Sequence, residues 1–268
     1  MTNNILFGDC RDTLKTLDVK ARMCVTSPPY YGLRDYGGEA NQIGQEDTPE
    51  KFIENLVDVF RSVRDVLTDD GTLWVNIGDS YYNYRPGKGQ ALVKQTLSKT
   101  DRDQPQDCPR RGNKLDGLKE KDLIGIPWML AFALRADGWY LRQDIIWHKP
   151  NPMPESVRDR CTKSHEYLFL LSKNKKYYYN NEAIKEPVKQ DWGTRDRTMG
   201  KYHNPGTGLA PHSGLSKSYD RKNKRSVWSI TNKPYKGAHF AVFPPDLIEP
   251  CILAGSEQGD IVLDPFMG

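Results

Sequence analysis

The chain has 268 residues and a mass of 30.7 kDa, with 37% hydrophobic residues, 28% charged residues and a formal net charge of +4. This is the composition of a globular protein with one large domain or two small ones. It has no run of 18 apolar residues, and no basic segment followed by an apolar one near its N-terminus. We therefore expect neither a membrane-spanning helix nor a secretory signal. Five scattered cysteines form no disulfide or zinc pattern, which favours a reducing, cytoplasmic location.

The first elements in chain order are two short apolar strands, at Ile5–Phe7 and Met23–Val25. A helix is predicted next, with Thr48 as its cap, Pro49 in its first turn and Gly71 after its end. Apolar residues at helical spacing form its inner face, and they are Phe52, Ile53, Leu56, Val57, Phe60, Val63 and Leu67.

The remaining pattern alternates strands with helices. Strands are predicted at Thr72–Ile77, Tyr140–Trp147, Tyr167–Leu171 and Ile261–Leu263. Helices are predicted at 127–138, with Trp128, Met129, Phe132 and Leu134 facing inward, and at 245–254. Short buried strands alternating with amphipathic helices predict an α/β sheet covered on both faces. Ligands of such sheets bind beyond the carboxyl ends of the strands.

The stretch after the strand at Met23–Val25 reads Thr26-Ser27-Pro28-Pro29-Tyr30. Consecutive prolines fix the backbone and have no amide hydrogen, so their carbonyls point in set directions. Ser27 and the Pro28 carbonyl can accept hydrogens from an exocyclic amine, while the Tyr30 ring offers a stacking surface for a planar molecule. The alternative is a turn that happens to contain two prolines.

Acidic residues follow two other predicted strands. Asp264-Pro265-Phe266-Met267-Gly268 comes directly after Ile261–Leu263, as at the start of a nucleotide-binding turn. Gly8-Asp9-Cys10 follows Ile5–Phe7. Asp9 can accept hydrogen bonds from a ribose or an adenine amine, or it can cap a helix at 12–17.

Two segments carry an excess of positive charge. Residues 185–225 contain ten Lys and Arg against four Asp and Glu, and residues 85–121 contain ten against five. Both are rich in polar residues and glycine, as expected of long surface loops. They are either solvated loops or surfaces for phosphate groups, and aromatic residues such as Trp192 and Tyr202 favour the second interpretation slightly.

Together, the Ser27–Tyr30 and Asp264–Gly268 motifs make the sequence resemble the amino-methylating DNA methyltransferases, which modify N-4 of cytosine or N-6 of adenine. The order of the motifs, catalytic first and cofactor last, is that of the circularly permuted β group of this family. The resemblance implies a Rossmann-like α/β methyltransferase fold, S-adenosylmethionine as cofactor, double-stranded DNA as partner, no metal, and a bacterial or phage restriction–modification system.

Site residues follow from the same resemblance. The catalytic residues it implies are Ser27, Pro28, Pro29 and Tyr30. The cofactor-binding residues it implies are Asp9, Cys10, Thr26, Asp264, Pro265, Phe266 and Gly268. Candidates for DNA contacts are Arg195, Arg197, Lys201, Arg221, Lys222, Lys224 and Arg225.

The resemblance also divides the chain. Residues 1–84 and 122–181 form the catalytic core, interrupted by the basic loop 85–121. Residues 182–235 form the target recognition region, and residues 236–268 the cofactor segment. In the family that segment continues beyond the glycine, so we expect either a truncated chain or a second polypeptide that supplies the remainder.

Several alternatives stay open from the sequence. Ser before Pro-Pro favours cytosine N-4 over adenine N-6. RNA, a protein glutamine amide, and a DNA-binding remnant without catalysis are other possibilities. His165-Glu166 resembles half of a zinc motif, but residue 169 is Phe, so we interpret the two as a packed pair or as a pair that supports other residues of a site. Trp147-His148-Lys149 is either a contact with DNA or with the base pocket, or a structural sheet end. We interpret all five cysteines as structural or incidental.

Overall fold

The computed structural model of the chain describes residues 4–33, 42–82, 115, 117–188, 220–232 and 242–267. The chain divides into a larger unit, Met1–Tyr179 with Ser226–Gly268, and a smaller unit, Asn180–Arg225. The larger unit contains a six-stranded sheet, and the smaller one a two-stranded sheet. Within the described ranges, no helix is both long and apolar enough to cross a membrane.

The six-stranded sheet has the order β7-β3-β4-β2-β1-β8. Its strands are β1 (Ala21–Thr26), β2 (Leu67–Ile77), β3 (Tyr140–His148), β4 (His165–Ser172), β7 (Val227–Ser229) and β8 (Val262–Leu263). β1 pairs in parallel with β2 and β8, and β3 with β7, whereas β4 is antiparallel to both β2 and β3. The N-terminal end of β4 therefore lies at the same edge as the carboxyl ends of the other five strands. We call this edge the carboxyl edge, and the opposite one the amino edge.

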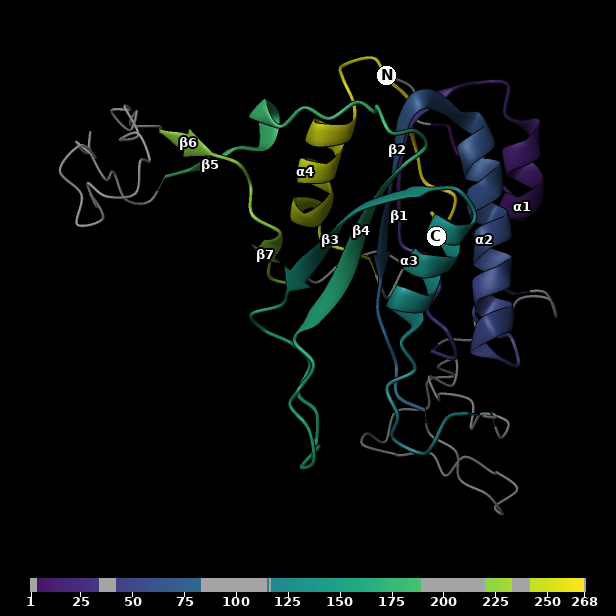
Figure 1. The fold of residues 1–268 in the computed structure, drawn as a ribbon, viewed down its shortest axis with the longest axis vertical. Helices are drawn as coiled ribbons and strands as arrows, with labels where there is room; N and C mark the ends of the chain where they lie inside the picture. Colours follow the sequence, from purple (N-terminus) through teal and green to yellow (C-terminus); the bar gives the residue numbers. More distant parts are fainter. Residues whose placement is uncertain are drawn as a thin grey trace, which may run out of the picture. The chain divides into compact units, whose positions relative to one another are not determined.

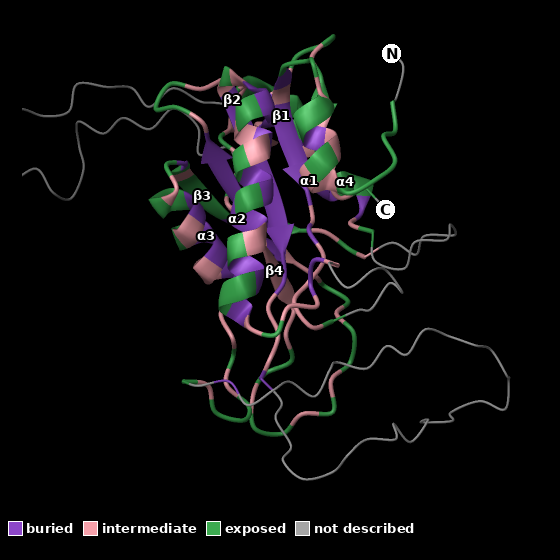
Figure 2. Ribbon diagram, turned by 90° about the vertical axis from the view of Figure 1, so that its right-hand side faces the viewer, coloured by how far each residue is buried: buried purple, intermediate pink, exposed green. Residues whose placement is uncertain are grey.

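Helices cover both faces of this sheet, as the alternating pattern predicts. α2 (Pro49–Val66) and α3 (Ile126–Ala136) lie on one face, and α4 (Pro245–Gly255) lies on the other (Figure 1). The main core forms beneath α2 and α3, where Phe52, Leu56 and Leu130 pack with Leu73 and Val75 of β2. α1 (Cys10–Thr13) and a 3-10 turn (Leu14–Thr16) lie beside α2, and Figure 2 shows the strands behind these helices as buried.

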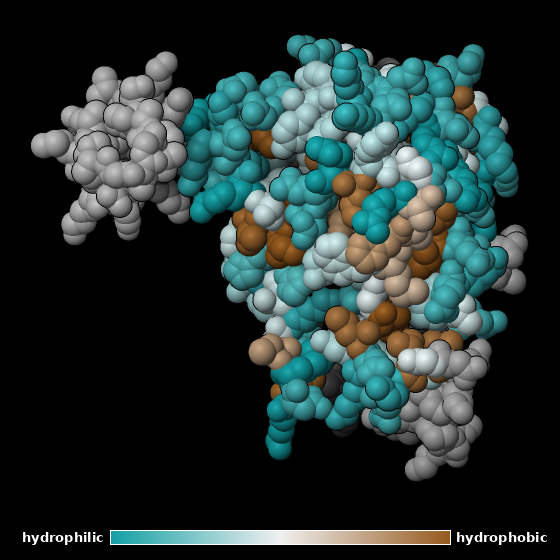
Figure 3. Space-filling view, in the orientation of Figure 1, coloured by the Kyte–Doolittle hydropathy of each residue, from teal (hydrophilic) through white to brown (hydrophobic). Residues whose placement is uncertain are grey.

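Helix α4 approaches the sheet closely at its C-terminal end. A Cβ atom on Gly255 would lie 3.0 Å from the sulfur of Met23 and 3.1 Å from both Thr72 Oγ1 and Trp74 Nε1. Since a side chain there would push α4 away from β1 and β2, glycine permits this packing. Figure 3 shows several separate groups of hydrophobic residues among hydrophilic ones on this face, and α4 exposes Ile252 and Leu253.

The start of α2 is confirmed, whereas its predicted end is wrong. The Thr48 side chain accepts a hydrogen bond from the Lys51 amide at 3.2 Å, and Pro49 is in the first turn. The helix ends at Val66, because Leu67 already has extended backbone angles and begins β2. Gly71 lies inside β2, where a Cβ atom would come 2.9 Å from the carbonyl oxygen of Thr68. Its role is close packing within the strand and not termination of the helix.

Two further predictions are wrong. Residues Ile5 to Phe7 form no strand, and Phe7 is 92% exposed. Three apolar residues are too few to define a strand when no neighbouring strand pairs with them. Phe132 is 46% exposed on α3, where its ring packs against Trp128 and carries the Arg135 guanidinium 4.8 Å from its centroid.

The smaller unit has a short two-stranded sheet. β5 (Glu186–Pro187) pairs antiparallel with β6 (Arg221–Lys222), after the 3-10 turn Glu182–Ile184. This smaller unit overlaps the predicted target recognition region 182–235, and the role of that region in DNA recognition remains a prediction.

Candidate active site

The Ser27–Tyr30 motif lies at the carboxyl edge, directly after β1. Pro28 is buried, while Ser27, Pro29 and Tyr30 are half-buried. β1 ends at Thr26 and lies between β2 and the edge strand β8. The motif is therefore surrounded by strand ends from both sides.

Tyr30 is held at its hydroxyl and along its ring. The hydroxyl donates a hydrogen bond to Glu166 Oε2 at 2.7 Å. The ring lies so close to the backbone of Gly78, just after β2, that a Cβ atom there would be 2.6 Å from Tyr30 Cε2. Burial, together with the negative charge of Glu166, raises the pKa of Tyr30 well above its usual value. The phenol therefore keeps its proton and remains a hydrogen-bond donor.

Glu166 is the centre of a polar network built from three strand ends. Asn76 of β2 donates to Glu166 Oε2 at 3.3 Å and to the Tyr167 carbonyl at 3.1 Å. The Lys149 ammonium, just after β3, forms an ion pair with Glu166 Oε1 and lies 4.2 Å from the centroid of the Trp147 ring. The antiparallel direction of β4 brings Glu166 to this edge, since it is the second residue of that strand.

A second polar group adjoins this network. The Asp79 carboxylate accepts hydrogen bonds from the amides of Gly125 and Ile126 at 3.0 and 3.1 Å, and so caps the N-terminus of α3. The Asp79 carbonyl accepts a hydrogen bond from Lys163 Nζ at 2.7 Å. Burial lowers the pKa of Lys163, although the charges of Asp79 and Glu166 act in the opposite direction.

The structure brings together two of the residues assigned to the cofactor, Thr26 and Asp264. The Thr26 hydroxyl donates to Asp264 Oδ1, and the amide of Phe266 donates to the same oxygen at 3.0 Å. Burial raises the pKa of Asp264, although both hydrogen bonds favour the ionised form. The Phe266 ring meets Phe60 of α2 edge to face, with 6.3 Å between centroids. Pro265 is half-buried, and Gly268 lies outside the described residues.

Asp9 and Cys10 lie at the start of α1. The Asp9 carboxylate accepts a hydrogen bond from the Arg11 amide at 2.8 Å and pairs with the Arg11 guanidinium, which lowers the pKa of Asp9. Burial raises the pKa of Cys10 to about 11, so the thiol is protonated at neutral pH. Of the two roles that the sequence left open for Asp9, the structure shows the helix cap; contact with a cofactor remains a prediction.

The predicted DNA-binding residues fall partly outside the described part of the chain, where Arg195, Arg197 and Lys201 lie. In the smaller unit, Arg221 donates to the Lys185 carbonyl at 2.8 Å, and the Arg225 guanidinium pairs with Glu186 at 3.0 Å. Lys222 lies in β6 and Lys224 just after it. Their assignment to DNA remains a prediction.

Sequence reasoning missed Glu166, Asn76 and Asp79 as members of the site. The available signal was a polar residue within or beside an apolar run: Asn76 interrupts Leu73–Ile77, and Glu166 precedes Tyr167–Leu171. Of the predicted pair His165-Glu166, His165 packs edge to face against the Tyr167 ring at 5.4 Å, whereas Glu166 binds Tyr30 and Lys149. Among the residues that the structure describes, no group of three His, Cys, Asp or Glu side chains is placed to hold a metal ion.

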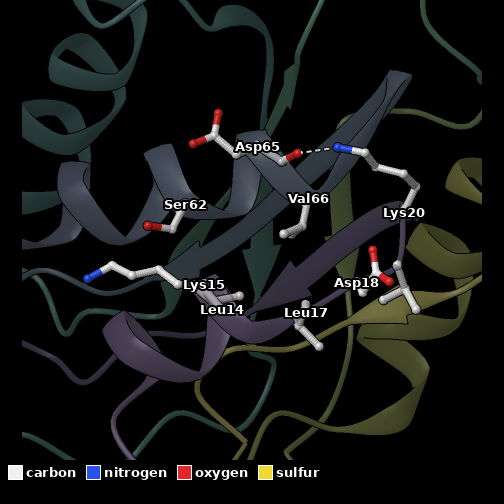
Figure 4. Close-up of a pocket in the computed structure, with 9 residues that line it drawn as sticks. Leu14, Lys15, Leu17, Asp18, Lys20, Ser62, Asp65 and Val66 are labelled. Atoms are coloured by element: carbon white, nitrogen blue, oxygen red, sulfur yellow. Dashed lines mark hydrogen bonds between the residues drawn. The ribbon is translucent and has the colours of Figure 1, made fainter.

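A cavity of about 460 Å³ lies elsewhere in the larger unit (Figure 4). It is lined by Leu14, Lys15, Leu17, Asp18, Val19, Lys20, Ser62, Asp65 and Val66. These residues belong to the end of α2 and to the segment before β1, so the cavity opens at the amino edge. Lys20 Nζ donates to the Asp65 carbonyl across it, at 2.5 Å.

Comparisons with known proteins place the chain in a family. Residues 21–268 match the family model N6_N4_Mtase, described as DNA methylase. The chain is 50% identical to the type II methyltransferase M.SmaI of Serratia marcescens, over 98% of this chain and 79% of that protein. It is 48% identical to M.Cfr9I of Citrobacter freundii, over 97% and 75%. Among solved structures it resembles PvuII DNA methyltransferase (cytosine-N4-specific), with a TM-score of 0.57 and 14% identity over 96% of this chain and 71% of that one.

Proposed function

Since the chain belongs to the N6/N4 DNA methylase family and is therefore an S-adenosylmethionine-dependent DNA methyltransferase, we propose that it methylates N-4 of cytosine in double-stranded DNA. The observation that carries the proposal is the placement of Ser27–Tyr30 at the carboxyl edge. There the Tyr30 ring is held by Glu166, and the Thr26–Asp264 pair adjoins the motif.

The chemistry requires help because an exocyclic amine on a base is a poor nucleophile: its lone pair is delocalised into the ring. The Ser27 hydroxyl and the Pro28 carbonyl can accept its two hydrogens and favour a pyramidal nitrogen. A base in a duplex must first leave the stack, and the Tyr30 ring offers a surface on which it can stack. Orientation and electrostatic stabilisation then supply most of the acceleration, with no covalent intermediate.

The cofactor supplies a methyl group on a positively charged sulfur and also carries an ammonium group. Asp264 fits such a ligand, because the donors to its carboxylate among the described residues, Thr26 and Phe266, both bind Oδ1, and Oδ2 can accept from a cationic donor. We assign the cofactor to Thr26, Asp264 and Phe266, together with Asp9, Cys10, Pro265 and Gly268 from the motifs. Thr26 fixes the orientation of the carboxylate.

The partner and the setting follow from the same proposal. The DNA is contacted by basic residues of the recognition region 182–235, namely Arg195, Arg197, Lys201, Arg221, Lys222, Lys224 and Arg225. The methyl mark protects DNA within a restriction–modification system in the cytoplasm of a bacterium, encoded by the cell or by a phage.

Nucleoside mass spectrometry tests the proposal. The chain is expressed in a methylation-deficient bacterium, and its genomic DNA is digested and analysed. We expect 4-methylcytosine in the DNA. A Ser27→Ala variant should produce at least about 100-fold less 4-methylcytosine than the unaltered chain while it still binds DNA. 6-Methyladenine would overturn the cytosine assignment. Absence of both marks with the unaltered chain would overturn the proposal as a whole.

A further inference from the structure

We propose that Glu166 and Lys149 are positioning residues for methyl transfer, acting through Tyr30. The Glu166 carboxylate, held by the Lys149 ammonium, fixes the plane of the Tyr30 ring against which the target base stacks. This inference rests on the proposed function, because it concerns how the base is held in that same site.

Two restraints on the Tyr30 ring carry the argument. The backbone of Gly78 supports the ring, with no room for even a methyl group between them. The hydrogen bond to Glu166, 2.7 Å long, holds the far end of the side chain. A phenol fixed at its hydroxyl and against a backbone surface can neither swing away nor tilt without losing a contact. The stacking surface is thus formed before the base arrives.

The carboxylate of Glu166 is itself held at both oxygens. Oε1 pairs with Lys149, while Oε2 accepts from Tyr30 and from Asn76. The side chains of Lys149 and Glu166 are only 17% and 15% exposed. Removal of one partner would leave the other charge largely buried without its counterion, and the carboxylate would then turn toward water. Lys149 therefore controls the direction in which Glu166 points.

The Lys149 ammonium has a second fixed neighbour. It lies 4.2 Å from the centroid of the Trp147 ring, and the Trp147 indole N–H donates to the Ile230 carbonyl at 2.9 Å. The ammonium is thus placed by an aromatic ring that is bound between β3 and the segment after β7. The tryptophan and the lysine of the Trp147-His148-Lys149 run are thus linked to Tyr30 through Glu166.

The test compares turnover with binding. The recognition sequence is first read from the methylated genomic DNA, and a duplex that contains it is used for kinetics. Glu166→Ala should lower kcat about 100-fold, as expected when a reacting group is misplaced by about 1 Å, with less than about a threefold change in the Kd for DNA. Glu166→Gln, which keeps an acceptor for Tyr30, and Lys149→Met should each lower kcat about 10-fold.

A double-variant comparison tests the route through the tyrosine. Tyr30→Phe removes only the hydroxyl, and combining it with Glu166→Gln should cost no more than the more severe of the two single changes. A duplex with 2-aminopurine at the target position reports stacking through its fluorescence. In complex with the Glu166→Ala variant this fluorescence should be brighter than in complex with the unaltered enzyme, because a displaced Tyr30 ring stacks less on the flipped base and quenches it less.

The matched control is Asp137→Asn. Asp137 is a similarly buried carboxylate, 11% exposed, which binds Arg61 and Arg64 at the amino edge. It should lower Tm and leave kcat unchanged. If the Glu166 variants behave like this control, or if the double variant is additive, the inference is overturned. A chain that makes no mark before any substitution would instead overturn the proposed function.

Discussion

The two edges of the sheet carry similar kinds of side chains in different arrangements. At the amino edge, Arg22 pairs with Asp70 and, at 3.1 Å, with Asp260, and its guanidinium lies over the Tyr178 ring. These contacts tie β1 to the beginning of β2 and to the segment before β8. At the carboxyl edge, Lys149 and Glu166 form a more deeply buried ion pair, and its contacts converge on Tyr30.

The comparison shows that an ion pair alone does not identify a functional site. At the carboxyl edge, the ion pair of Lys149 and Glu166 holds the ring of Tyr30, which follows β1 and belongs to no strand. The predictions below separate the two edges by measuring turnover and stability in the same variants.

The largest effect is expected from Gly78→Ala. The new methyl group would occupy the space of the Tyr30 ring, 2.6 Å from its Cε2 atom, and must displace the ring. We expect kcat to fall about 100-fold, with a small change in Tm, measured by steady-state methylation and thermal unfolding.

Gly255→Ala is the matched substitution at the α4 interface. Its new methyl group would crowd Met23, Thr72 and Trp74. It should destabilise the fold by about 1 to 3 kcal/mol, as overpacking does, and leave kcat of the folded enzyme unchanged. Equal losses of turnover in both variants would contradict the distinction between ring support and general packing.

A smaller effect is expected from Asp264→Asn, which should raise Tm at neutral pH but weaken the binding of S-adenosylmethionine. The amide keeps an acceptor for Thr26 and removes a charge that burial disfavours. Because the folded-state pKa of Asp264 is raised, its ionisation costs stability as pH rises above the ordinary value of 3.8. The variant should therefore gain Tm relative to the unaltered chain as pH increases from below 3.8 to 7, and bind S-adenosylmethionine about 10-fold more weakly by calorimetry.

Thr26→Val provides the control for that change. It removes the hydroxyl donor and keeps the carboxylate charge, so Tm at pH 7 should fall instead of rising. If Asp264→Asn instead lowered Tm at neutral pH, the folded protein would favour the ionised form of Asp264, which would contradict the raised pKa.

The smallest effect is expected from Arg22→Leu at the amino edge. The change removes two ion pairs and the contact with Tyr178, each of which is partly exposed to solvent. We expect a loss of about 1 kcal/mol in the free energy of unfolding, measured by urea denaturation, and no change in kcat. A tenfold loss of turnover would mean that the two edges are coupled.

The sequence predicted those parts of the fold that depend on long apolar patterns and on caps. The helix capped by Thr48 and the strand at Thr72–Ile77 are examples, because their periodicity extends over many residues. Local patterns gave wrong ends for elements where pairing within the sheet determines the backbone conformation. Leu67 fits the apolar face of the predicted helix, but it pairs with Ala21 and belongs to a strand.

The candidate site was predictable where it follows a strand directly, as at Thr26–Tyr30 and Asp264. The rule that ligands bind at carboxyl ends did not point to Glu166, because that rule holds for parallel strands. The pairing of the strands shows that β4 is antiparallel to β2 and β3, and this reversal brings the beginning of β4 to the site.

The hydrogen bond between Thr26 and Asp264 joins residues 238 positions apart in the chain. A ribosome that adds 5 to 20 residues per second makes the second residue about 10 to 50 s after the first. β1 to β4 and the ring of Tyr30 can form while synthesis continues, whereas Asp264 is not yet present. The nascent enzyme therefore has the surface for a base well before it has the carboxylate that we assign to the cofactor, and it becomes competent only when β8 joins the sheet.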